Sequence, residues 1–173
     1  MNIFANVIGI IAVIVFNFSY QLKTRRNLIV CNAASRILYV LQYLLLGAYS
    51  GAVLDVTALC VSMIYKRAAT FEKKQLILTV ILSNLAVVGL GLLTYESLFS
   101  LLPILGVIFE TMALVPKSER KIRALSLLGA PPWLAYNLLS GAYGSAVGNV
   151  ITLVTIGIAI LRFDILKKEG SER

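Results

Sequence analysis

The sequence predicts an all-α membrane protein of seven transmembrane helices, built as two parallel three-helix repeats joined by one extra helix. Composition is the first reason: 59% of the 173 residues are hydrophobic, only 14% are charged and the mean hydropathy is +0.88. Such values lie outside the range of soluble globular proteins. The other two reasons are seven long apolar stretches with basic residues between alternate pairs, and an internal repeat.

Seven apolar stretches separated by short connectors follow one another along the chain. They cover 3–22, 28–46, 51–65, 76–95, 98–115, 124–139 and 144–161. The third is short against the usual length of about 20 residues, and the turn at 47–51 leaves open where it begins. The first stretch lacks the basic start of a signal peptide, so we expect it to be a retained span.

Basic residues fall on one side of the predicted membrane. All but one of the sixteen lie on alternate connectors or the tail: Lys23, Arg25, Arg26, Lys66, Arg67, Lys73, Lys74, Lys117, Arg120, Lys121, Arg123, Arg162, Lys167, Lys168 and Arg173. Because Lys and Arg accumulate in cytoplasmic loops, the N-terminus is predicted outside and the C-terminus in the cytoplasm. The net charge of +8 is therefore interpreted as a topology signal, and no nucleic-acid partner is expected.

A shift of 94 residues without a gap superimposes two parts of the sequence. Residues 44–59 then match 138–153 at nine of sixteen positions. The polar turn at 23–26 falls over 117–120 in the same register, which scattered matches between apolar runs would not produce. We therefore predict a first unit at 1–66, a linker with the fourth helix at 67–95, a second unit at 96–163 and a cytoplasmic tail at 164–173. The fourth helix returns the chain so that the second unit begins on the same side as the first.

This arrangement resembles the SWEET and PQ-loop superfamily of small transporters, and the whole chain resembles the YgjV-type bacterial inner-membrane proteins grouped near it. The most specific local element is Trp133-Leu134-Ala135-Tyr136 followed by Asn149, which is similar to the Trp and Asn that hold sugar in SWEETs. Tyr39 and Asp55 take the matching positions of the first unit. The resemblance implies a transporter-like fold in the bacterial inner membrane.

The sequence departs from that superfamily at several prolines. Tyr20-Gln21 stands where the Pro-Gln pair would be expected. Pro103, Pro131 and Pro132 have no proline opposite them in the first unit. The fold is therefore the safer expectation, and the resemblance leaves the transported solute open.

Four residues are the candidate substrate-binding set: Trp133, Asn149, Tyr39 and Asp55. An indole ring can stack on a solute, and an amide can both donate and accept hydrogen bonds. Interface anchoring by Trp133 and interhelical bonding by Asn149 remain the alternatives. A carboxylate such as Asp55 is costly within a span unless it meets water, a partner or a proton, although hydration near the outer surface would also satisfy it.

Arg36 and Glu110 are the other ionisable residues expected at membrane depth. They are candidates for a gate latch between the units or for proton coupling, and a structural ion pair is the alternative. Pro131 and Pro132 are candidate hinge residues because prolines kink a helix, although a static kink fits equally well.

Together these observations predict a carrier for a small polar solute, a sugar among the candidates, either uniporting or proton-linked. The alternative is a non-transporting sensor or scaffold with the same fold. Without histidine, and without a nucleophile beside a base, no enzyme activity, metal or cofactor is expected. Cys31 and Cys60 are interpreted as buried small residues. The expected partners are the lipid bilayer and the solute, and GxxxG spacings at 47–51 and 144–148 leave a homodimer open.

Overall fold

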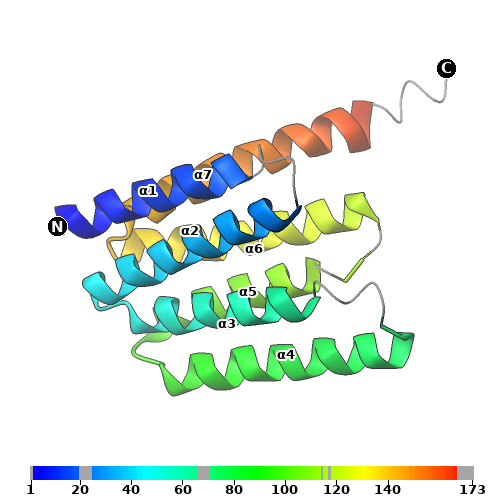
Figure 1. Ribbon diagram of the computed structural model, residues 1–173, viewed down its shortest axis with the longest axis horizontal. Helices are drawn as coiled ribbons and strands as arrows, with labels where there is room; N and C mark the ends of the chain where they lie inside the picture. The colour runs from blue at the N-terminus through cyan, green and yellow to red at the C-terminus, as the bar shows by residue number, and fades with distance from the viewer. Residues whose placement is uncertain (1, 20–24, 66–70, 114, 117, 167–173) are drawn as a thin grey trace.

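The computed structural model describes residues 2–19, 25–65, 71–113, 115–116 and 118–166 (Figure 1). Within these residues the chain forms seven α-helices and no strand, which confirms the all-α prediction. The helices are α1 (Ile3–Ser19), α2 (Arg25–Leu46), α3 (Tyr49–Tyr65), α4 (Lys73–Leu93), α5 (Leu101–Ala113), α6 (Glu119–Leu139) and α7 (Tyr143–Ile160). A short 3-10 helix, η2 (Leu98–Ser100), leads into α5, and a π-helical segment, η3 (Leu161–Leu166), follows α7.

The observed helices differ from the predicted stretches mainly at their ends. α2 already begins at Arg25 and α6 at Glu119, ahead of the apolar runs that start at 28 and 124. An apolar run marks what can lie in hydrocarbon, whereas a helix continues into charged sequence because its backbone bonds do not depend on the side chains. α5 instead ends at Ala113, before the predicted 115. Residues 20–22 and 114 of the predicted spans lie outside the described residues.

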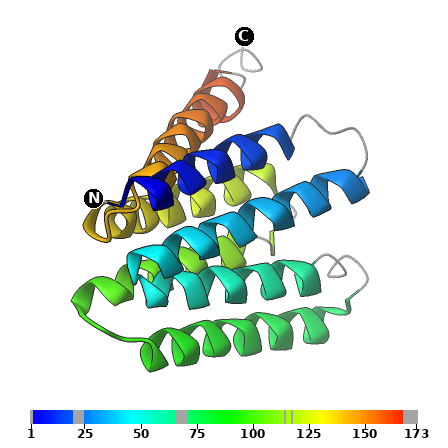
Figure 2. The same ribbon diagram turned by 60° about the vertical axis from the view of Figure 1, so that its left-hand side comes forward.

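Six of the helices pack into a closed ring. Going round it, α1 packs on α2, α2 on α3, α3 on α5, α5 on α6, α6 on α7 and α7 on α1. α4 lies outside the ring against α3 and α5, at the lower edge in both views (Figures 1 and 2). The Thr111 hydroxyl donates a hydrogen bond of 3.0 Å to the Asn84 side-chain oxygen, which ties α4 to α5.

The turns from α2 to α3 and from α6 to α7 share one backbone conformation. Gly47 and Gly141 have φ angles of 70° and 74°. The amide that follows each glycine closes a turn, from Ala48 to the Tyr43 carbonyl (2.9 Å) and from Ala142 to the Asn137 carbonyl (2.8 Å). Side chains disfavour positive φ, so glycine is the residue that ends both helices and permits the tight reversal.

The molecule is apolar outside and largely small or polar inside. Large apolar side chains are exposed along α1, α4 and α7, among them Phe4, Ile14, Ile81, Leu85, Val147 and Val154. The buried set includes many alanines together with Gln42, Asp55, Thr111, Asn137 and Ser145. A water-soluble surface does not expose apolar area on this scale, and small residues with polar contacts are typical of helix packing in membranes.

Two helices are long and apolar enough to cross a membrane by length and composition. They are Lys73–Leu93 and Tyr143–Phe163. Four other apolar helices are shorter, at Ile3–Phe18, Ala33–Leu46, Tyr49–Ile64 and Leu98–Ala113. The seven-span topology is therefore a prediction for most of the helices.

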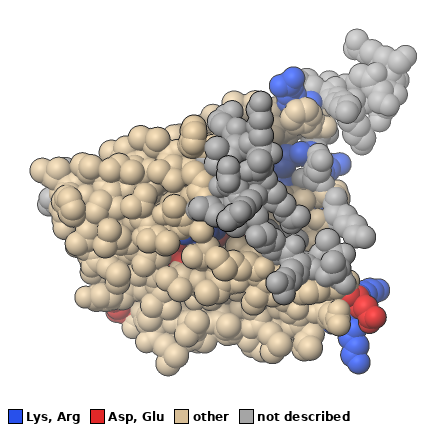
Figure 3. All heavy atoms as spheres, viewed as in Figure 1, with Lys and Arg blue, Asp and Glu red and all other residues tan. Residues whose placement is uncertain are grey.

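Basic side chains gather at one end of the bundle (right in Figure 3). Within the described residues, the helix ends on this side carry Lys73 and Lys74 (α4), Arg120, Lys121 and Arg123 (α6), and Arg162 (η3). The side chains at 23, 25, 26, 66, 67, 117, 167, 168 and 173 lie outside the described part of the chain. We call this the basic end, and we call the end that carries the Gly47 and Gly141 turns the turn end. A few red and blue atoms also lie in the middle of the face shown, surrounded by tan atoms (Figure 3).

Candidate functional site

A cavity of about 570 Å³ lies inside the ring. Every ring helix contributes to its wall, and no described residue of α4 does. The four predicted binding residues, Tyr39, Asp55, Trp133 and Asn149, all line it. The structure therefore brings together on one surface side chains that lie up to 110 positions apart in the sequence.

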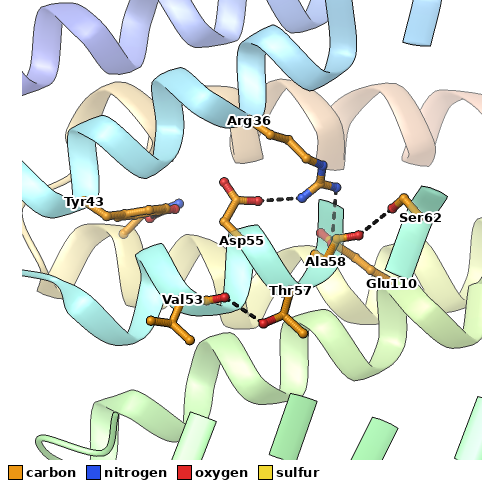
Figure 4. Close-up of polar contacts among 9 residues, drawn as sticks. Arg36, Tyr43, Val53, Asp55, Thr57, Ala58, Ser62 and Glu110 are labelled. Atoms are coloured by element: carbon orange, nitrogen blue, oxygen red, sulfur yellow. Dashed lines mark hydrogen bonds and ion pairs between the residues drawn. The ribbon is translucent and has the colours of Figure 1, made fainter. Parts of the chain in front are cut away.

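An arginine with two carboxylates occupies one wall of the cavity (Figure 4). Arg36 Nη1 lies 2.5 Å from Asp55 Oδ1, and Arg36 Nη2 lies 3.8 Å from Glu110 Oε2. The ion pair of Arg36 with Glu110 that the sequence suggested is present, at the longer distance. The closer partner is Asp55, which the sequence did not pair with Arg36, because the adjacent helices α2 and α3 bring those two side chains face to face. The side chains of Arg36, Asp55 and Glu110 are 18%, 7% and 38% exposed, so Glu110 is the most accessible of the three.

Three aromatic rings close the cavity towards the turn end. The Trp133 ring stacks on that of Tyr43, with centroids 6.1 Å apart and planes 20° apart, and Tyr136 packs against both. Trp133 rests on Gly106, where an added Cβ would stand 2.6 Å from the indole Cδ1. The Trp133 indole Nε1 is buried and has no hydrogen-bond partner of normal geometry. A buried donor in a cavity wall is a group that a bound molecule can satisfy.

Two asparagines form a second polar wall. Asn137 Nδ2 donates a hydrogen bond of 2.6 Å to Asn149 Oδ1, and Asn137 Oδ1 accepts one of 2.8 Å from the Tyr43 hydroxyl. Asn137 and Tyr43 were not among the predicted site residues. The shift of 94 residues could have found them, because it places position 43 on position 137. The bond from Asn137 also fixes the Asn149 amide through its oxygen, which leaves the Asn149 NH2 group to meet a solute.

The two predicted hinge prolines stand beside the cavity and not in its wall. α6 continues through Pro131 and Pro132, while the neighbouring Ala130 and Trp133 line the cavity. The hinge role of these prolines stays a prediction.

Metal ligands do not cluster in the described part of the chain, where no three His, Cys, Asp or Glu residues could hold an ion together. Cys31 is half-buried and its thiol donates to the Val15 carbonyl at 3.4 Å. Cys60 is exposed, so its predicted burial is wrong. An apolar exterior accepts a thiol on the outer face of α3 as readily as in the core.

Comparison with known families gives the chain its assignment. Residues 3–167 match the family model Imp-YgjV, described as a bacterial inner membrane protein. The chain belongs to the Imp-YgjV family. As an Imp-YgjV protein it is a bacterial inner membrane protein, which agrees with its apolar exterior. No curated protein and no solved structure matches the chain, so the relation to SWEET and PQ-loop transporters stays an expectation.

The cavity wall that carries Arg36, Asp55 and Glu110 is unusual for a membrane protein such as this Imp-YgjV protein. Ionisable side chains within a bilayer are costly and face water, a partner or one another. Arg36, Asp55 and Glu110 face one another in the wall of one cavity, beside the buried indole donor of Trp133. The site can thus offer a cation, carboxylate acceptors, amide groups and an aromatic face to a small polar molecule.

Proposed function

We propose that this Imp-YgjV protein is a carrier for a small polar solute that works by alternating access between two three-helix units. The observation that supports it best is a cavity of about 570 Å³ with ionic and polar walls inside a bundle with an apolar exterior. Such walls cost stability in a membrane. A protein with only a structural role would be better served by an apolar core.

The helix bounds support two parallel units. Shifting α2 (Arg25–Leu46) by 94 gives 119–140, against Glu119–Leu139 for α6. Shifting α3 (Tyr49–Tyr65) gives 143–159, against Tyr143–Ile160 for α7. The positive-φ glycines 47 and 141 coincide under the same shift, while α4 has no counterpart. Parallel repeats with the substrate between them are a known plan among transporters.

The proposed orientation follows from the charges. The basic end would face the cytoplasm, so the N-terminus would lie outside and the C-terminus inside. The shorter helices α1, α3 and α5 lie alongside α4 and α7 in both views (Figures 1 and 2). We therefore propose that all seven cross the same slab of hydrocarbon, because a bilayer can thin locally around short helices.

In this proposal the two units supply complementary halves of the site. Trp133 would stack on the solute and donate its indole N–H, while Asn149 contributes its amide. Tyr39 and Asp55 would face them from the first unit. Glu110 lies 3.8 Å from Arg36 and is 38% exposed, so we propose it as the carboxylate that exchanges a proton or leaves Arg36 when the units move.

The proposal is tested by uptake into proteoliposomes. The panel would contain labelled neutral polyols and sugars, amino acids and small organic cations, each with and without a pH gradient. The wild type is compared with the Trp133→Ala, Asn149→Ala double variant. Tyr143→Ala serves as a matched control, because this aromatic side chain lies at the start of α7, is 46% exposed and lies outside the cavity wall.

A carrier predicts flux of one solute class that the double variant loses and the control keeps. Loss of a pH-gradient dependence in Glu110→Gln would identify proton coupling through that carboxyl. Absence of flux for every class, from protein whose fold is verified, would refute the carrier and favour a membrane sensor or scaffold.

A further inference from the structure

The cavity is asymmetric along the bundle. Towards the basic end its wall continues through Asn17, Ser62 and Arg123 to the helix termini. Towards the turn end it stops at Tyr43, Asn137 and Ser145, and no described residue of the turn-end connections lines it. Among the described residues, the cavity wall therefore extends to the last turns of helix at the basic end, whereas a layer of side chains bounds the cavity at the turn end.

Three buried hydrogen bonds hold that layer together. Tyr43 Oη donates to Asn137 Oδ1 at 2.8 Å, the Gly51 N–H donates to Tyr136 Oη at 2.9 Å, and Ser145 Oγ donates to Gln42 Oε1 at 2.5 Å. All six residues are buried. Each bond joins a helix from the first half of the chain to one from the second. We call these six residues the turn-end layer.

The layer follows the internal repeat. Residues 42 and 51 shifted by 94 become 136 and 145, so the Gln42 to Ser145 and Tyr136 to Gly51 contacts are equivalent to each other. Tyr43 and Asn137 are equivalents that bond directly. Contacts of this kind are typical of an interface around a twofold axis, where residue i meets j and j meets i. A movement that separates the two halves at this layer would thus lengthen all three bonds together.

Asn137 also connects the layer to the candidate site. Its oxygen holds Tyr43, and its Nδ2 donates to Asn149 Oδ1, which lines the cavity. Resting on the proposed function, we propose that the turn-end layer is a gate, closed in this structure, and that Asn137 is the positioning residue that couples the gate to solute bound at Asn149. A solute that binds the Asn149 side-chain amide competes with Asn137 for it. Asn137 is then no longer held by Asn149, and its hydrogen bond to the Tyr43 hydroxyl weakens.

The test measures access to the cavity from each side of the membrane. Thr152→Cys, on the cavity wall, is the reporter in a chain whose Cys31 and Cys60 are replaced by alanine. Labelling by a charged, membrane-impermeant thiol reagent is timed in right-side-out and inside-out vesicles. With the gate intact, we expect fast labelling from the basic end and slow labelling from the turn end.

The gate variants are Tyr43→Phe and, at an independent bond, Ser145→Ala. Each should speed labelling from the turn end about tenfold, the effect of losing one buried hydrogen bond worth about 1.4 kcal/mol. Tyr143→Phe, an exposed tyrosine outside the layer, should change nothing. Three results would each overturn the gate. They are equal labelling from both sides with the gate intact, no labelling from the basic end, and gate variants that label at the same rate as the control.

Coupling through Asn137 has its own readout. Asn149→Leu removes the bond that orients the Asn137 amide, so labelling from the turn end should rise several-fold, as in Asn137→Ala. An unchanged rate in Asn149→Leu would overturn the coupling. The labelling experiment needs no transported solute, so it separates the gate from the proposed carrier. If no solute is taken up but labelling is one-sided, the carrier alone is refuted. If a solute is taken up but labelling is equal from both sides, the gate alone is refuted.

Discussion

Removing the Arg36 guanidinium should lower the free energy of unfolding more than removing either of the two carboxylates beside it. Arg36→Gln leaves Asp55, whose side chain is 7% exposed, without its partner at 2.5 Å. Loss of one member of a buried pair costs about 3–5 kcal/mol. The low end, about 3 kcal/mol, applies because Arg36 is 18% exposed to the cavity.

The carboxylate variants should follow in a fixed order. Asp55→Asn leaves Arg36 with Glu110 at 3.8 Å, so we expect a loss of about 1.5–2 kcal/mol from the missing charged hydrogen bond. Glu110→Gln should cost under about 1 kcal/mol, because this carboxylate is 38% exposed and its contact is long. The Arg36→Gln, Asp55→Asn double variant should resemble Asp55→Asn rather than the sum of the two single losses.

Thermal unfolding followed by tryptophan emission measures these losses directly, because Trp133 is the single tryptophan and lines the same cavity. At about 2–4 °C per kcal/mol for a chain of this size, Arg36→Gln should lower the Tm by roughly 6–12 °C. The reasoning is refuted if Asp55→Asn lowers the Tm as much as Arg36→Gln and the double variant shows the sum, since the two residues would then act independently.

Three glycine substitutions test the packing around the site. Gly106→Val should displace the Trp133 ring, since even a Cβ at this position stands 2.6 Å from the indole. The displacement should shift the tryptophan emission maximum to the red while the helical circular dichroism is retained. An unshifted maximum would contradict the close contact of Gly106 with Trp133. Gly141→Ala forces a residue with a side chain into φ 74°, which should cost about 1–2 kcal/mol of stability and lower the Tm by roughly 4 °C. Gly157→Ala is the control that should leave the Tm unchanged, because an added Cβ there meets nothing within 4 Å. Gly144→Ala would set a Cβ 2.5 Å from the Asn6 carbonyl oxygen of α1, so faster proteolysis of detergent-solubilised protein is expected, and wild-type resistance would count against close α1 to α7 packing.

Much of the architecture could be predicted from local sequence. Long apolar stretches correctly located all seven helices, and errors fell at the ends, as with Arg25 and Glu119, where helix continues past the apolar run. The register of 94 residues correctly paired the two glycine turns. The four candidate binding residues, which lie far apart in the sequence, share one cavity wall: Tyr39, Asp55, Trp133 and Asn149. Their role in binding a solute remains a prediction.

Which side chains meet across the helices was decided by tertiary structure alone. The sequence offered Arg36 two carboxylates at different distances along the chain, and only the packing of α2 on α3 selected Asp55 as the close partner. Asn137 and Tyr43 went unnoticed, although together they join the two halves of the ring. In a soluble protein the apolar stripe of a helix would have indicated its inward face. In a membrane, lipid and core both accept apolar side chains, so the sequence of each helix determines that it forms and leaves its rotation to be settled by the contacts it makes.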